Sequence, residues 1–420
     1  MSNMKYSGVE WLGEIPEDWK VSRYKFYTQN RMGITILSND LVDTTENIDN
    51  IIPVYSATQD DKIFGYVEHA NLLLHKGDLV IPARGNSIGC MKIIKDDVAT
   101  CTQTTICSTN IVNIDNRILY YCSIGLKEYW YKYDGSAIPQ ITVKQIMENK
   151  IPVPTKIEQQ KIANFLDKKC SQIDKLTSNQ EQQIENLKSY KQSLITETVT
   201  KGLNPNVKMK SSGIDWIGEI PNNWDIIKFK QLGTVRNGLT YSPSDLCDKE
   251  DGTLILRSSN IKNGQLYYDD NVYVSCDIKE ELKVKPGDIL ICSRNGSKKL
   301  IGKNALIDSI DATFGAFMMI FRSEYNSKYI KYILDSSVFQ YYLGTFLTAT
   351  INQLTGANFK NMEVPFVWDK EEQQQIVSYL DDKCSKIDTL IEIKDKKIKN
   401  LNEYKKSLIY EYVTGKKEIN

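Results

Sequence analysis

Two short polar segments carry the side chains best suited to molecular recognition: ARGNSIG (residues 83–89) and SRNGSKKLIG (residues 293–302). Each places arginine, asparagine and serine on a glycine-rich turn, which can approach another backbone closely. Arginine and asparagine form bidentate hydrogen bonds with base edges, and lysine pairs with phosphate. The candidate DNA-binding residues are therefore Arg84, Asn86, Ser87, Arg294, Asn295, Ser297, Lys298, Lys299 and Lys303.

Both segments are expected to begin where a buried strand ends. LLLHKGDLVIPA (residues 72–83) and VKPGDILICS (residues 284–293) each contain Gly-Asp followed by an apolar run. This pattern predicts a turn and then a buried strand. A surface hairpin with ordinary polar residues is the alternative interpretation of either segment alone. The occurrence of two such segments in one chain favours a role in DNA binding over two ordinary surface hairpins.

Signatures of catalysis are weak in this sequence. GSKKLIGKN (residues 296–304) resembles a phosphate-binding loop, but five residues separate its glycines where that loop has four, and Asn304 occupies the place of the magnesium-binding serine or threonine. The two histidines, His69 and His75, offer little for general-base or metal chemistry. We therefore predict no catalytic residue, no metal site and no enzyme activity in this chain.

The candidate residues must be positioned by two long helices, which the chain contains as near copies. EQQKIANFLDKKCSQIDKL (residues 158–176) recurs 214 positions later as EQQQIVSYLDDKCSKIDTL (residues 372–390). Neither contains glycine or proline, and their apolar residues repeat every seven. A repeat of this kind over about 43 residues predicts a coiled coil roughly 65 Å long, in which the two helices pair with each other.

Two rows of side chains are expected to form the coiled-coil seam. The first row comprises Leu166, Ile173, Leu187 and Leu194 and their copies Leu380, Ile387, Leu401 and Leu408. The second row comprises Ile162, Leu176 and Tyr190 and their copies Ile376, Leu390 and Tyr404. Gln180 and its equivalent Lys394 interrupt the first row, so an antiparallel pair should have a polar layer at its middle.

The remainder of the chain is duplicated as well. SGVEWLGEIPEDW (residues 7–19) recurs as SGIDWIGEIPNNW (residues 212–224), and its tryptophans and proline indicate a packing clip at a domain edge. SAIPQIT (residues 136–142) recurs more loosely as TATINQLT (residues 348–355). A repeat of this length indicates a duplicated domain followed by a helix. The ends of the two copies match closely and their middles differ.

The predicted fold class is α+β, with two mixed α/β domains joined by two long helices that form a coiled coil. The expected boundaries are residues 1–155 for the first domain, 156–203 for the central helix, 204–210 for a linker, 211–369 for the second domain and 370–416 for the C-terminal helix. Short strands punctuated by Gly, Asn and Asp, with helical runs between them, favour this assignment.

Composition excludes a chain that is basic throughout: 53 basic and 53 acidic residues give a formal net charge of zero. Local basic patches remain possible. The nine cysteines include no CxxC pair, which favours reduced thiols in a cytosolic protein. The sequence suggests neither a signal peptide nor a membrane span, so we expect a cytoplasmic protein without a membrane partner.

Together these segments closely resemble the specificity subunit of type I restriction–modification systems, over nearly the whole chain. The helices with EQQxI, LDxK and ID carry the resemblance, supported by the WLGEIPxxW boxes and by IPVPTKIEQQKIANFLD (residues 151–167). The resemblance implies two target-recognition domains held apart by two long helices that form an antiparallel coiled coil, in a subunit that reads a bipartite sequence in double-stranded DNA. It also implies that the helices act as a spacer and as the docking surface for two methylation subunits.

Further expectations about partners come from the same resemblance. Restriction subunits that translocate and cut DNA would join the complex. S-adenosylmethionine would be bound by the methylation subunits, which methylate adenine, and this chain itself would hold no cofactor. The alternative is a coiled-coil scaffold for protein interactions without DNA specificity. A self-contained methyltransferase is disfavoured because the cofactor motifs are missing from the sequence.

Overall fold

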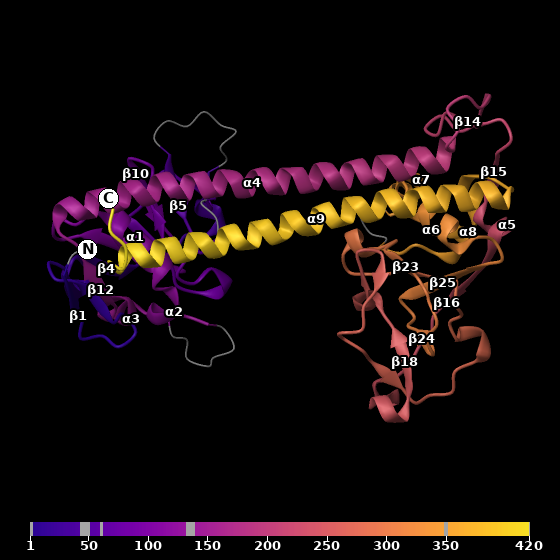
Figure 1. Cartoon of the computed structure of the whole chain (residues 1–420). Coiled ribbons are helices and arrows are strands. Elements are labelled where there is room, and N and C mark those ends of the chain that lie inside the picture. The colour runs from indigo at the N-terminus through magenta and orange to yellow at the C-terminus, as the bar shows by residue number, and fades with distance from the viewer. Residues whose placement is uncertain (1–2, 43–50, 59–61, 132–138, 348–351, 420) are drawn as a thin grey trace. The chain divides into compact units, whose positions relative to one another are not determined.

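The computed structural model describes residues 3–42, 51–58, 62–131, 139–347 and 352–419, so the first parts of the predicted segments SAIPQIT and TATINQLT lie outside the described residues. The chain forms two compact units: unit 1 comprises Met1–Glu181 and Asp395–Asn420, and unit 2 comprises Gln182–Lys394. Each unit contains a mixed domain and parts of both long helices (Figure 1). The predicted fold class is confirmed: two mixed domains with two long helices that pack together.

Unit 1 is built around two four-stranded sheets, with strand orders β4-β11-β8-β9 and β6-β5-β10-β7, and two short pairs, β1-β2 and β12-β3. Within the second sheet, β5 and β10 run parallel. Its strands are β1 Met4–Tyr6, β2 Glu14–Pro16, β3 Lys20–Arg23, β4 Thr28–Met32, β5 Ile52–Tyr55, β6 Gly65–Val67, β7 Leu74–His75, β8 Leu79–Pro82, β9 Lys92–Ile93, β10 Val98–Cys101, β11 Thr105–Asn110 and β12 Lys150–Val153. Its short helices are α1 Asn116–Gly125, α2 Lys127–Trp130 and α3 Val143–Glu148.

Unit 2 repeats this plan, with the sheets β16-β25-β22-β23 and β17-β21-β18-β24 and the pairs β13-β14, β15-β26 and β19-β20. The hairpin β19-β20 belongs to the part of the chain where the second copy is longer. Its strands are β13 Met209–Ser211, β14 Glu219–Pro221, β15 Asp225–Lys228, β16 Gly233–Asn237, β17 Leu246–Cys247, β18 Thr253–Leu256, β19 Ile261–Lys262, β20 Gln265–Leu266, β21 Tyr273–Val274, β22 Ile289–Cys292, β23 Asn304–Leu306, β24 Ala312–Phe314, β25 Met318–Ser323 and β26 Glu363–Phe366. Its short helices are α5 Phe229–Leu232, α6 Ser327–Asp335, α7 Ser337–Phe346 and α8 Gly356–Asn361.

The two buried strands predicted after Gly-Asp are β8 and β22. All four residues of each strand are buried. Gly77 and Gly287 at the preceding turns have φ of 94° and 88°, in the left-handed region that favours glycine. Each strand pairs antiparallel with a central neighbour, β11 in unit 1 and β25 in unit 2.

The long helices α4 (Lys156–Lys201) and α9 (Lys370–Val413) begin and end where the local sequence directs. Thr155 and Glu158 form a reciprocal capping pair before α4. Asp369 accepts the backbone N–H of Glu371 (2.8 Å) before α9. Gly202 follows α4 with φ of 72°, a conformation that commonly terminates helices.

Both helices contribute to the hydrophobic core of each unit. Leu166 and Ile173 of α4 share the unit 1 core with Leu408 of α9. Leu380 of α9 shares the unit 2 core with Ile195 of α4. Of the predicted first row, Leu166, Ile173, Leu380, Ile387 and Leu408 are buried, whereas Leu187, Leu194 and Leu401 are half-buried. None of the eight side chains is exposed, so this row faces the packed side of the helices.

The predicted second row is wrong beyond its first member. Ile162 and Ile376 are buried, but Leu176, Tyr190, Leu390 and Tyr404 are exposed. The structure instead uses a row offset by one residue, which includes Ala163, Cys170, Thr177, Ile184 and Lys191, with copies Val377, Cys384, Ile391, Ile398 and Lys405. Small and polar residues in this row concealed it in the sequence.

Ion pairs link the two helices within each unit. Lys405 Nζ lies 2.6 Å from Asp174 Oδ1 in unit 1, and Lys191 Nζ lies 2.7 Å from Asp388 Oδ1 in unit 2. The two lysines are 214 positions apart, as are the two aspartates. Because each pair joins the early half of one helix to the late half of the other, the helices run antiparallel in both units.

Gln180 and Lys394, the two polar residues that interrupt the first row, lie near the middle of the helices. Gln180 is buried, and the Lys394 ammonium donates to the side-chain oxygen of Gln183. All nine cysteines lie among the described residues and are free thiols. No helix in the described ranges combines the length and apolar character needed to cross a membrane.

Candidate nucleic-acid interface

The WLGEIPxxW boxes fasten each domain to the start of a long helix. Trp19 is buried and its indole N–H donates to Glu158 Oε1 (3.1 Å) in unit 1. Trp224 is buried and donates to Glu372 Oε1 (2.9 Å) in unit 2. The predicted packing clip therefore includes a hydrogen bond to the first glutamate of each EQQ segment.

A second fastening uses the aspartate in each LDxK segment. Tyr121 and Tyr332 donate to Asp167 and Asp381 at 2.7 and 2.6 Å, respectively. Burial, together with the neighbouring carboxylate, raises the pKa of both tyrosines, so both remain neutral donors. Each domain is thus held to its helix by matching contacts.

The segment of unit 1 that contains Arg84 (residues 83–89), called the arginine turn below, follows β8. Two other segments contact it at Ala83. The Ala83 N–H donates to the Thr104 carbonyl (2.9 Å), and the Ile141 N–H donates to the Ala83 carbonyl (3.0 Å). An isolated antiparallel bridge joins Arg84 to Gln140. The backbone of Arg84 is therefore fixed on both sides, while its side chain is exposed.

The arginine turn of unit 2 (residues 293–302) makes the equivalent contacts. The Ser293 N–H donates to the Phe317 carbonyl (2.9 Å), and the Leu354 N–H donates to the Ser293 carbonyl (2.8 Å). A bridge joins Arg294 to Gln353, and the exposed Arg294 guanidinium lies 5.4 Å from the centroid of the Phe317 ring.

The inner part of each turn is anchored to the loop that follows β5 or β18. The Ser87 hydroxyl donates to the Ala57 carbonyl (2.8 Å) within the short 3-10 helix η3 (Gly85–Ser87). The Asn295 amide donates to the Ser258 hydroxyl (3.2 Å), and its oxygen accepts the Ser297 N–H (3.0 Å). Ser87 and Asn295 therefore shape their turns from within.

The structure brings the candidate residues together as two clusters, one in each unit. Those with exposed side chains are Arg84, Asn86, Arg294, Ser297, Lys298 and Lys299. Lys303 and Asn295 are half-buried, and Ser87 is buried. Lys298 and Lys299 lie on the 3-10 helix η8 (Lys298–Leu300), and their ammonium groups have no hydrogen-bond or ion-pair partner among the described residues.

Two glutamines next to the arginines are absent from the sequence-based candidates. Gln140 and Gln353 are exposed and are paired with Arg84 and Arg294, respectively, through the backbone. Glutamine binds adenine in the same bidentate way as asparagine. The signal was the shared Gln of SAIPQIT and TATINQLT, but nothing in the sequence placed that segment beside the arginine turn.

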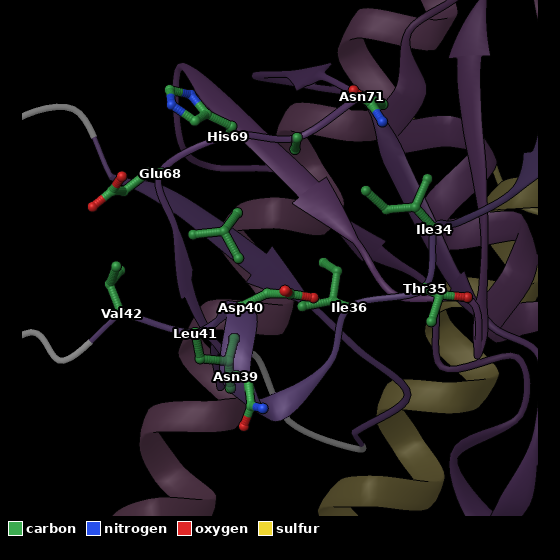
Figure 2. Close-up of a pocket in the computed structure, with 12 residues that line it drawn as sticks. Ile34, Thr35, Ile36, Asn39, Asp40, Leu41, Val42, Glu68, His69 and Asn71 are labelled. Atoms are coloured by element: carbon green, nitrogen blue, oxygen red, sulfur yellow. The ribbon is translucent and has the colours of Figure 1, made fainter.

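A separate pocket in unit 1 is lined by Ile34, Thr35, Ile36, Asn39, Asp40, Leu41, Val42, Val67, Glu68, His69, Ala70 and Asn71. Figure 2 shows the carboxylates of Asp40 and Glu68 and the imidazole of His69 around it. Two acids without a lysine or arginine among the lining residues oppose phosphate binding. His69 and His75 are exposed, and the described residues contain no cluster that could hold a metal ion.

Comparison with known proteins is consistent across sequence and structure. The family model "Type I restriction modification DNA specificity domain" matches residues 16–186 and 221–403. The specificity subunit of the type I restriction enzyme MjaVIII from Methanocaldococcus jannaschii is 28% identical over 420 residues, covering 96% of this chain and 93% of that protein. The EcoKI specificity subunit from Escherichia coli is 30% identical over 179 residues, covering 41% of this chain and 38% of that protein.

A solved structure supports the fold. A chain described under the structural basis of complex assembly and conformational transition of the type I R-M system has a TM-score of 0.70 and 15% identity. The similarity covers 95% of this chain and 98% of that one. The family model covers most of the present sequence and matches it twice, once over each mixed domain and the long helix that follows it. The chain therefore belongs to the family of type I restriction–modification DNA specificity domains.

Proposed function

We propose that this chain is the specificity subunit of a type I restriction–modification complex and reads a bipartite sequence in double-stranded DNA. The observation that carries the proposal is the pair of equivalent exposed arginine turns, one in each unit. Each turn belongs to a domain that is fastened to a long helix by the same tryptophan–glutamate hydrogen bond. Arg84 and Arg294 would each bind a base edge or phosphate in one half-site. Because one chain contains two such turns, it would recognise two separate half-sites.

The proposed role of this chain within the complex is non-catalytic. The described cysteines, histidines and acids form no metal cluster, and the sequence offers no cofactor motif. S-adenosylmethionine would be bound by the methylation subunits, and DNA cleavage would belong to the restriction subunits. The chain would act where DNA is accessible, in the cytoplasm.

Two copies of the methylation subunit would dock on the long helices. Leu176 and Tyr404 in unit 1 correspond to Leu390 and Tyr190 in unit 2, and all four are between 46% and 57% exposed. In unit 1, Leu176 is two residues from Asp174 and Tyr404 is next to Lys405, so both residues lie close to the interhelical ion pair. Exposed aliphatic and tyrosine side chains are typical interface anchors. Two equal sets of anchors fit two copies of one partner.

The stoichiometry can be tested with the double variant Leu176→Ser/Tyr404→Ser. Because these side chains are exposed, unfolding of the chain should change little, while one of two methylation subunits should be lost. Native mass spectrometry of the co-expressed subunits measures the ratio, and Leu390→Ser/Tyr190→Ser is the matched control for the other unit. Retention of both copies by all four substitutions together would place the docking surface elsewhere.

The decisive test of DNA recognition is to map methylated adenines in cells that carry the complete system. A bipartite motif that disappears when this chain is deleted is the expected result. Gel shifts on duplex DNA, with and without the methylation subunits, distinguish this function from a protein scaffold. Incubation of the purified chain with DNA and labelled S-adenosylmethionine should give no methyl transfer. Robust transfer by the chain alone would make it a methyltransferase instead.

A further inference from the structure

Both arginine turns contain an arginine that is paired with a glutamine through the backbone. If the two units read different sequences, the difference must come from other residues of the two turns. Arg84 with Gln140 and Arg294 with Gln353 have the same types and the same backbone pairing. Neither pair can by itself give one half-site a base preference that the other lacks. The residue of the third segment whose carbonyl accepts the first N–H of each arginine turn does differ: it is Thr104 in unit 1 and Phe317 in unit 2.

Thr104 and Phe317 occupy the same position of the same kind of turn. In unit 1 the Thr105 N–H donates to the Thr102 carbonyl (3.0 Å). In unit 2 the Met318 N–H donates to the Gly315 carbonyl (2.8 Å). Each closes a four-residue β-turn that leads into the central strand, and Thr104 or Phe317 is its third residue. Differences between the two side chains are therefore not caused by a different backbone.

The side chains of Thr104 and Phe317 differ in polarity and in exposure. Phe317 is 59% exposed, and its ring lies beside the exposed Arg294 guanidinium. Thr104 is half-buried, and its hydroxyl lies 2.8 Å from the Thr102 hydroxyl, so its polar atom is used inside unit 1. Unit 2 thus presents an apolar ring next to its arginine at the turn position that Thr104 occupies in unit 1.

We propose that Phe317 is a specificity-determining residue and that its ring contacts the C5-methyl group of a thymine in the half-site read by unit 2. Phenylalanine makes this apolar contact in the major groove, where the methyl group marks thymine among the four bases. The thymine lies next to the position contacted by Arg294, because the ring and the guanidinium are adjacent. This inference rests on the proposed function and adds the base that unit 2 recognises.

Uracil tests the inference directly, because it differs from thymine only by that methyl group. The complex of this chain with its methylation subunits is bound to duplexes in which each thymine of the second half-site, on either strand, is replaced by uracil in turn. The wild-type complex should bind one of these duplexes about fourfold more weakly, the effect of losing one buried methyl group. The variant Phe317→Thr should bind the thymine duplex similarly weakly and should no longer distinguish uracil from thymine at that position.

Phe26 provides a matched control. It is 58% exposed and has the Lys25 ammonium 5.6 Å from its ring centroid, but it precedes β4 at the end of the sheet opposite the arginine turn. The variant Phe26→Thr should behave as the wild type on every duplex.

Three results would overturn the inference: a second half-site without any A·T pair, a wild-type complex indifferent to every uracil, or a Phe317→Thr complex that still discriminates. If Phe317→Thr weakens binding while uracil has no effect on the wild type, Phe317 only positions Arg294. In each of these cases the complex still recognises its bipartite site. A wild-type complex without any sequence preference would instead contradict the proposed function.

Discussion

The helical frame, meaning α4 and α9 with the WLGEIPxxW boxes fastened to them, and the two arginine turns differ in how closely unit 1 and unit 2 resemble each other. Matching ion pairs between α4 and α9 measure 2.6 and 2.7 Å, and matching tryptophan–glutamate hydrogen bonds measure 3.1 and 2.9 Å. The arginine turns keep the same backbone connections but differ in length, charge and neighbouring side chains. The frame therefore fixes where a turn is presented, and the turn can vary without disturbing the frame.

The largest expected effect is a loss of assembly when only one long helix is lengthened. One heptad inserted after Asn179 alone shifts half of α4 by two turns, so the Asp174–Lys405 and Lys191–Asp388 pairs cannot both form with a continuous seam. The variant should aggregate or fail to copurify with methylation subunits. Size-exclusion chromatography measures this loss, and normal assembly would show that the two units do not depend on a common helix register.

A second heptad inserted after Ile393 should rescue that variant. Both helices then lengthen by roughly 10 Å, which corresponds to about three base pairs of duplex. The gap between the half-sites, mapped from methylated adenines, should change accordingly, although three base pairs also rotate the second half-site by about a quarter turn or more. Part of the activity should be lost for that reason. Full activity with the original gap would show that the helices do not set the spacing.

The Gly-Asp turns should differ in their contribution to stability. Asp288 is 1% exposed and forms a bidentate pair with Arg322 at 2.7 and 2.6 Å. Asp78 is half-buried and accepts the His75 N–H (2.8 Å), and Thr109 occupies the position equivalent to Arg322. Asp288→Ala should cost about 3 kcal/mol, because Arg322 loses a buried partner. Asp78→Ala should cost about 1.5 kcal/mol.

Urea unfolding followed by hydrogen exchange in β8 and β22 separates the two effects. The double variant Asp288→Ala/Arg322→Met removes the unpaired charge and should recover part of the loss. Equal costs for the two aspartate variants would mean that the ion pair adds nothing beyond the shared turn.

The arginine substitutions should weaken DNA binding rather than folding, and each effect should be confined to one half-site. Arg84→Ala should weaken binding by about 1–3 kcal/mol if the guanidinium is bidentate to guanine, and should relax preference only in the half-site read by unit 1. Arg294→Ala should do the same for the other half-site. Competition binding with substituted duplexes measures each preference. Unchanged affinity and methylation pattern in both variants would remove the arginine turns from the interface.

Much of the frame could be predicted because its signals are local and periodic. The heptads of Leu166 and Leu380 and the absence of glycine and proline predicted α4 and α9, and Gly-Asp predicted β8 and β22. The second row of the seam was predicted wrongly because the most hydrophobic heptad positions, such as Leu176 and Tyr190, are not the ones that the structure buries. Each helix also packs against its domain, and this contact buries Cys170 and leaves Tyr190 in solvent.

The candidate site was only partly predictable. Arg84 and Arg294 were identified as candidates from their own turns, but Gln140 and Gln353 are paired with them through bridges across more than 50 residues of sequence. Phe317 lies in the apolar run AFMMIF (residues 316–321), which by itself favours burial, and the turn between β24 and β25 exposes its ring. Contacts between distant segments depend on the assembled sheet, which no local pattern specifies.

The smallest expected effect concerns the ion pairs between the helices, which should contribute equally in the two units. The lysines are 29% and 24% exposed and the aspartates 51% and 57%, so water screens both pairs to a similar extent. A double-mutant cycle of Lys191→Ala with Asp388→Ala should give a coupling of about 0.5 kcal/mol. The cycle of Lys405→Ala with Asp174→Ala is the matched experiment in unit 1 and should agree within about 0.3 kcal/mol. Thermal unfolding at low and high salt measures both couplings, and both should shrink as salt increases. A coupling present in one unit and absent in the other would show that the two halves of the frame are not energetically equivalent, despite their matching geometry.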